Sequence, residues 1–270
     1  MLETYGHPIF KWLHVIAGIV WIGLLYFFNF INGHVAATLD GESKKKVVPE
    51  LMPRTLYWFR WGAAWTWVTG ILLLYIIFWQ GNLSIGDDSG STLIDAGNSA
   101  TMFTHIMLSI TFLSVFIYDF FYKSSIAKNV RLATIISYAY VGLMVYLYTC
   151  YANMGYRGVN IHLGAMFGTM MAFNVWFRIW PAQQQIITAV KDGNAPDGNL
   201  VALAGLRSKH NTYMSVPLIW TMINQHTTAF ESISIFGTTI VGKYWLMFFV
   251  ALGWHIVFQL YKKSAKIKGF

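Results

Sequence analysis

Long apolar runs alternate with short polar segments along all 270 residues of the chain. Seven of these runs are long enough to cross a bilayer, because a helix needs about 20 residues to span roughly 30 Å of hydrocarbon. In lipid, only helices and closed barrels satisfy their own backbone hydrogen bonds, and runs of this length favour helices. The pattern therefore predicts an all-α, polytopic helix bundle that forms one transmembrane domain over residues 1–270. The predicted spans cover residues 8–32, 56–80, 99–122, 130–151, 158–180, 210–228 and 238–261.

The positive charges follow every second connection between these spans. Of the 19 lysines and arginines, all but Lys11, Arg157 and Lys243 lie in or beside the connections after the first, third and fifth spans, or in the C-terminal tail. Cytoplasmic connections of membrane proteins carry this excess. We therefore expect the N-terminus outside and the C-terminus in the cytoplasm, with a polar external loop at 82–98. A cytoplasmic connection is expected at 183–209, with a turn at 193–198.

Composition agrees with a membrane protein and narrows the chemistry. Hydrophobic residues make up 56% of the chain and charged residues 11%, whereas a soluble domain carries about 25% charged residues. The net charge of +8 follows from the basic connections and gives no reason to expect a nucleic acid partner. A single cysteine, Cys150, excludes an internal disulfide, a four-thiolate cluster and a C-x-x-C-H site for covalent haem.

Seven of the eight histidines fall at two depths of the predicted bundle. Four of them, on four different helices, share one depth toward the outer face: His14, His105, His162 and His226. An ionisable residue inside a span is a functional-site hypothesis by default, and imidazole is a common ligand of haem iron and transition metals. Any one of these histidines could instead be hydrogen-bonded to a neighbouring helix. Aromatic and aliphatic surroundings favour haem over a hard cation, which would need carboxylates.

Three more histidines lie toward the cytoplasmic face and leave room for a second haem: His34, His210 and His255. Both haems would be non-covalent haem b. The inner haem is the weaker alternative, because two ligands on one helix must face the same way. His210 and His226 are 16 residues apart and point in different directions around an ideal helix. Only a kink at Pro217 would align them.

Several segments resemble a known family. They are residues 12–23 (WLHVIAGIVWIG), 33–34, 53–61 (PRTLYWFRW), 67–70, 157–158, 162–165, 174, 207–213 (RSKHNTY), 217, 224–226 and 254–255. Together they resemble the PuuD-type membrane urate oxidase (urate hydroxylase) family, and the opening helix is more distantly similar to HemJ-type haem-binding membrane oxidases. The resemblance implies a multi-pass protein of a bacterial inner membrane. Members of the urate family carry a further span and a C-terminal cytochrome c domain, so here a separate cytochrome c is the expected electron acceptor.

Two functions remain open. The first is an enzyme that oxidises urate or a similar heterocycle at the outer face and sends electrons through haem to a periplasmic cytochrome c. Its candidate substrate-binding residues are Arg157, Asn160 and Gln225, since a guanidinium suits a planar anion; Arg157 could equally anchor its helix at the membrane interface. The second is a non-enzymatic haem b subunit of a respiratory or oxidase complex. A carrier without haem is disfavoured, because buried charges and an inverted repeat are not evident.

Overall fold

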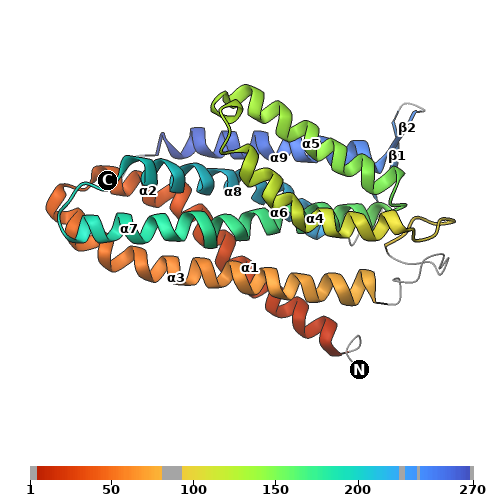
Figure 1. The fold of residues 1–270 in the computed structure, drawn as a ribbon, viewed down its shortest axis with the longest axis horizontal. Helices are drawn as coiled ribbons and strands as arrows, with labels where there is room; N and C mark the ends of the chain where they lie inside the picture. Colours follow the sequence, from red (N-terminus) through yellow and green to blue (C-terminus); the bar gives the residue numbers. More distant parts are fainter. Residues whose placement is uncertain (1–4, 81–92, 225–228, 236–237, 268–270) are drawn as a thin grey trace.

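The computed structural model describes residues 5–80, 93–224, 229–235 and 238–267 as a helix bundle with one small hairpin (Figure 1). The α-helices are α1 (His7–Phe27), α2 (Gly33–Thr38), α3 (Gly41–Leu74), α4 (Met102–Phe121), α5 (Val130–Cys150), α6 (Tyr156–Asn174), α7 (Trp180–Lys191), α8 (Gly198–Asn224) and α9 (Gly242–Ser264). Wider π-helical turns extend α1, α3 and α6; they are η2 (Phe28–Asn32), η3 (Tyr75–Trp79) and η5 (Val175–Ile179), and a short 3-10 turn is η4 (Ile126–Lys128).

Among the described residues, five helical stretches are long and apolar enough to cross a membrane: His7–Thr38, Gly41–Trp79, Met102–Phe121, Val130–Cys150 and Gly242–Ser264. Many large apolar side chains on these helices are exposed, which a water-facing surface would not tolerate over so large an area. The chain is therefore a multi-pass membrane protein, and the all-α prediction is confirmed. α6 and α8 occupy the remaining two predicted positions but are more polar. Seven spans and the orientation remain predictions.

The predicted connections on one side of the bundle are mostly helical, which corrects the sequence interpretation. α3 begins at Gly41 rather than near residue 56, because Asp40 caps it by accepting hydrogen bonds from the backbone N–H and the hydroxyl of Ser43 (2.8 and 2.9 Å). These bonds lower the pKa of the Asp40 carboxyl. Likewise α7 and α8 fill most of 183–209, leaving only the predicted turn after Lys191.

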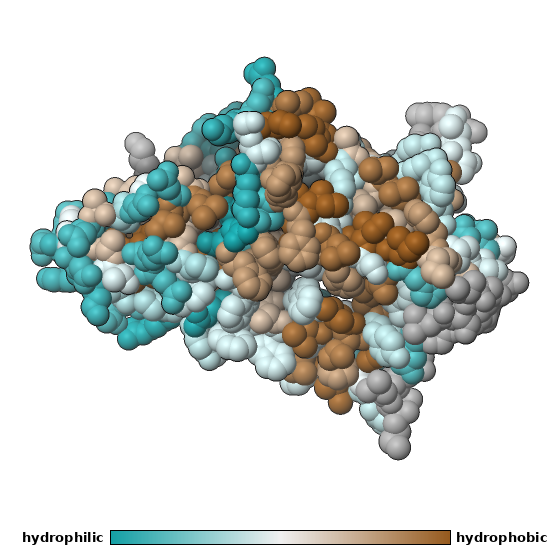
Figure 2. Space-filling model, in the orientation of Figure 1, coloured by the Kyte–Doolittle hydropathy of each residue, from teal (hydrophilic) through white to brown (hydrophobic). Residues whose placement is uncertain are grey.

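These longer helices project beyond the apolar part of the bundle. Gly41–Trp79 has 39 residues, about 58 Å at 1.5 Å per residue, against about 30 Å of hydrocarbon. Hydrophilic residues gather at the left end in Figure 2, where α3 begins and α7 ends, and hydrophobic residues dominate the middle. α1 begins and α9 ends at opposite ends of the bundle (Figure 1).

α6 and α8 form the centre, and the apolar helices surround them. α6 packs against α3, α4, α5 and α8, whereas α1 packs mainly on α3. α6 approaches α8 closely at Gly164, where an added Cβ would overlap Thr221 and Met222. α8 continues through Pro217, and Gly253 of α9 packs on the proline ring.

One element was not predicted. Residues Ser232–Ile235 (β1) and Thr238–Val241 (β2) form an antiparallel hairpin with Ser232 opposite Val241. The last predicted span was expected to begin at 238, but α9 begins at Gly242. The β-branched residues of this segment favour strand, and apolar periodicity alone did not separate it from the helix that follows.

Candidate functional site

Two of the predicted histidines meet at one tryptophan at the end of α3. Trp79, in η3, donates a hydrogen bond from Nε1 to Nε2 of His162 on α6 (3.1 Å). The ring of His105, on α4, lies 5.6 Å from the Trp79 ring, and Tyr148 of α5 packs 5.9 Å from the His162 ring. Four helices thus contribute one side chain each. We call Trp79, His105, Tyr148 and His162 the outer cluster.

Hydrogen bonds define the protonation of His162. Nδ1 lies 2.8 Å from the backbone carbonyl of Gly158, which can only accept, so Nδ1 carries the proton. Nε2 then holds the lone pair and accepts from Trp79. His105 also has its Nδ1 beside a backbone carbonyl, 2.9 Å from that of Thr101, so this Nδ1 carries a proton as well. In both residues the Nε2 lone pair is the one that a metal would use.

His14 lies apart from the outer cluster, on the α1 face that packs on α3. Its Nδ1 is 3.2 Å from Oγ1 of Thr69, whose own hydroxyl proton is donated to the carbonyl of Trp65 (2.6 Å). The hydroxyl oxygen therefore accepts from Nδ1–H, again leaving the lone pair on Nε2. Gly70 makes room for the imidazole, because a Cβ there would lie 3.0 Å from Cε1. A ring fixed by an Nδ1–H bond is the usual preparation of an iron-binding histidine.

Among the described outer histidines, the structure keeps His14 apart from His105 and His162. Thr69 and Trp79 are ten residues apart on the same helix, about 15 Å along its axis. One iron therefore cannot be bound by both His14 and His162 in this arrangement. His226 and the proposed substrate residue Gln225 lie outside the described residues. Where residues are described, no group of three or more His, Cys, Asp or Glu side chains could hold a metal ion.

The hydrogen bonds and the burial of each histidine indicate whether it could bind haem iron. His14 fits, since its Nδ1 is engaged and its ring is only partly buried. His162 is fully buried and both of its nitrogens are engaged, so it would bind iron only after Trp79 moved away. The use of His14, His105, His162 and His226 as ligands stays a prediction.

The three inner histidines also lie in different surroundings. His34 on α2 and His255 on α9 are exposed, and His255 Nε2 is 3.1 Å from the side-chain amide nitrogen of Gln259. His210 on α8 is mostly enclosed: its Nδ1 is 2.9 Å from the hydroxyl of Tyr118, and its ring lies 4.2 Å from that of Tyr122. The structure does not bring these three residues to one place, and an inner haem stays a prediction.

A group of charged residues near His210, two of them buried, was not predicted from the sequence. Asp119 of α4 accepts from Arg178 of η5 (2.9 and 2.6 Å) and from Arg207 of α8 (2.9 Å), and it pairs with Lys123 (2.7 Å). We call Asp119, Lys123, Arg178 and Arg207 the inner charge cluster. An acid at the end of one span and arginines at the ends of two others were the available signal.

Polar side chains continue from this cluster into the centre of the bundle. Asn174 donates from its amide nitrogen to the hydroxyl of Tyr118 and to Oδ1 of Asn211 (both 2.8 Å). Asn211 in turn donates to the carbonyl of Met171 (2.9 Å). These hydrogen bonds link α4, α6 and α8, and Oδ1 of Asn174 has no partner among the described residues.

The predicted substrate residues lie at the start of α6. Asn160 is fully buried; its amide nitrogen donates to the carbonyl of Tyr156 (2.9 Å), and its Oδ1 has no hydrogen-bond donor among the described residues. Arg157, three residues earlier, is partly buried. Buried amide oxygens are nearly always paired, so among the described residues Asn160 Oδ1 is an acceptor that a ligand or water would satisfy.

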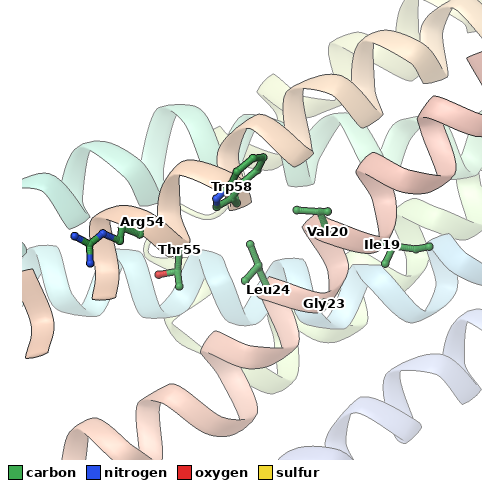
Figure 3. A pocket seen from close by; sticks show the side chains of 7 residues that line it. All are labelled: Ile19, Val20, Gly23, Leu24, Arg54, Thr55 and Trp58. Carbon is green, nitrogen blue, oxygen red and sulfur yellow. The ribbon is translucent and has the colours of Figure 1, made fainter. Parts of the chain in front are cut away.

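A groove on the surface lies away from these residues. A groove of about 470 Å³ between α1 and α3 is lined by Ile19, Val20, Gly23, Leu24, Arg54, Thr55 and Trp58 (Figure 3). Arg54, at one end of it, pairs with Glu50 (2.8 Å). The groove is open and almost entirely apolar and includes none of the candidate site residues.

One known protein family matches most of the chain. The family described as "urate oxidase N-terminal" matches residues 41–261. The chain belongs to this family. No curated protein and no solved structure matched the chain. The match to the urate oxidase N-terminal family includes the outer cluster, the inner charge cluster and Asn160, whereas His14 and His34 precede it. Membership of this family indicates an oxidoreductase role in the membrane.

Proposed function

We propose that this protein is a haem-containing membrane oxidoreductase of the PuuD type. In this proposal it oxidises urate or a closely related heterocycle and passes the electrons to a cytochrome c outside these 270 residues. The family match over residues 41–261 is the observation that carries the proposal. The arrangement of His14, with Nδ1 bonded to Thr69, adds support for a haem.

The residues that would hold the haem are histidines whose Nε2 carries the lone pair. His14 is the first candidate, and the second ligand would come from another of the predicted histidines or from solvent. When bound, haem supplies a one-electron redox centre whose potential depends on its ligands and surroundings. Thr69 would keep the His14 imidazole oriented, and Gly70 would keep the space beside it open.

The start of α6 would receive the substrate. Urate is a planar anion with several N–H groups, and Asn160 offers a buried amide oxygen with no donor among the described residues. Arg157, one turn away, would add a positive charge able to bind two acceptors of a planar anion. Both residues would bind and orient the substrate, and no catalytic base is assigned.

Electron transfer from urate tests the proposal. Hydroxylation of urate with water as the oxygen source releases two electrons and two protons, so each urate should reduce two molecules of a one-electron cytochrome c. Purified, haem-containing protein mixed with urate and added cytochrome c should reduce the cytochrome in that ratio. Asn160→Ala should weaken urate binding while leaving the haem spectrum unchanged.

A haem-containing preparation that reduces neither cytochrome c nor an artificial acceptor, and whose spectrum urate does not change, would contradict the enzyme. Co-purification with cytochrome or oxidase subunits would then favour the alternative function, a haem b subunit of a larger respiratory complex.

A further inference from the structure

Arg207 of α8 has unused hydrogen-bonding capacity inside the protein. Its side chain is 1% exposed, and Nη2 donates to Asp119 (2.9 Å). No atom of the described residues accepts a hydrogen bond from Nε or Nη1. A buried donor without an acceptor costs about 1–3 kcal/mol, and more when it is charged. Such a group in a folded protein calls for a ligand or an ordered water.

The charges around Arg207 do not balance. One carboxylate, Asp119, faces three cations, Lys123, Arg178 and Arg207. The phenol of Tyr118 packs against Arg207 with its ring 5.0 Å from the guanidinium carbon, and it is bonded to His210, so it adds no negative charge. Lys123 is exposed and Arg178 is partly exposed, whereas Arg207 is enclosed. Asp119 is shared among the three cations and compensates the charge of Arg207 only in part, and a partly compensated positive charge at the edge of a bilayer is costly.

We propose that a small monovalent inorganic anion, the size of a halide ion, binds at Nε and Nη1 of Arg207. The enclosure of the side chain limits the size of the ligand, and two adjacent N–H groups of a guanidinium suit an anion. A water molecule would accept from the same N–H groups but would leave the excess charge uncompensated. The anion would tie α8 to α4 and η5 through the inner charge cluster.

Thermal unfolding of the purified full-length protein tests this site. The midpoint should be measured while sodium gluconate is replaced by sodium chloride at constant ionic strength, because gluconate is too large for the enclosed space. A bound ion stabilises in proportion to the logarithm of its concentration above its dissociation constant. The midpoint should therefore rise by about 3–6 °C at chloride concentrations near ten times that constant.

Two variants separate the site from general salt effects. Arg207→Lys keeps the charge and a donor for Asp119 but removes the two adjacent N–H groups, so its midpoint should not respond to chloride. Lys128→Gln removes an exposed positive charge on the same side of the protein and should respond like the wild type. Crystals grown with sodium bromide should have an anomalous peak beside Arg207.

An equal response to chloride in the wild type and in Arg207→Lys would overturn the proposal. So would a wild-type midpoint that ignores the identity of the anion, since Arg207 would then be bonded to water. If Arg207→Lys fails to fold, the crystals grown with bromide still test the proposal. The absence of an anomalous peak beside Arg207 would then overturn it.

Discussion

Helices α1 and α6 both carry a histidine predicted as a haem ligand, but they lie in opposite surroundings. Only two of the 21 residues of α1 are buried, whereas 13 of the 19 residues of α6 are. α1 is one of the five stretches apolar enough to cross a membrane, and α6 is not. A helix that faces lipid must be apolar around most of its surface, whereas a helix enclosed by others can carry polar groups if they are paired.

This difference explains where the site residues gather. The buried polar side chains of α6 include Asn160, His162 and Asn174, and each has a hydrogen-bond partner on its own or a neighbouring helix. His14 on α1 has a partner only on the side that packs against α3. Hydropathy therefore finds α1, α3, α4, α5 and α9 better than it finds the enclosed helix α6, which carries Asn160, His162 and Asn174.

The inner charge cluster should contribute most to stability. Asp119→Asn removes the single carboxylate and leaves the buried Arg207 without a counter-charge. Breaking a buried pair in this way should lower the free energy of unfolding by about 3–5 kcal/mol. Denaturation of the purified protein in detergent would measure the loss.

The matched control lies on the surface of α3. Glu50→Gln breaks the exposed pair with Arg54 and should cost less than about 1 kcal/mol, because solvent screens exposed pairs. Similar losses in Asp119→Asn and Glu50→Gln would mean that the inner charge cluster does not hold α4, η5 and α8 together.

A smaller difference in stability should distinguish a substitution in α6 from one in α1. Gly164→Ala adds a methyl group that would overlap Thr221 and Met222, whereas at Gly23 of α1 nothing lies within 4 Å of the added Cβ. Gly164→Ala should destabilise the protein by about 1–3 kcal/mol. Gly23→Ala should be neutral or slightly stabilising, since alanine favours helix more than glycine does. The difference in unfolding midpoint between the two variants measures how much more closely α6 is packed than α1. A larger loss of stability from Gly23→Ala than from Gly164→Ala would contradict this prediction.

The sequence predicted the fold class and the approximate position of each long helix. The thickness of the bilayer sets the length of an apolar run, so each run can be recognised from its own consecutive residues without knowledge of the rest of the fold. The first 15 residues of α3 and the first 12 of α8 lie in predicted connections, because they are polar and basic and the predicted spans are limited to segments of high hydropathy. Hydropathy does not distinguish a helix that continues into water from a loop. Asp40 followed by Ser43 is, however, a sequence signal for the start of a helix.

The site could be predicted only in part. Histidine placement identified His14, His105 and His162 as candidates, but which of them meet depends on contacts between residues far apart in the chain. Trp79 and His162 are 83 residues apart, and no local pattern links them. The same holds for the pairing of Asp119 with Arg178 and Arg207, which depends on how α4, η5 and α8 pack.

The most direct test of the account is the haem content of the purified protein. A reduced-minus-oxidised visible spectrum and a haem-to-protein ratio should reveal non-covalent haem b, close to one per chain. His14→Ala should lose most of it, whereas His34→Ala, which replaces an exposed histidine, should keep it. A protein without haem, prepared under conditions that retain haem in other membrane cytochromes, or equal haem content in the two variants, would contradict the assignment of His14 and the oxidoreductase built on it.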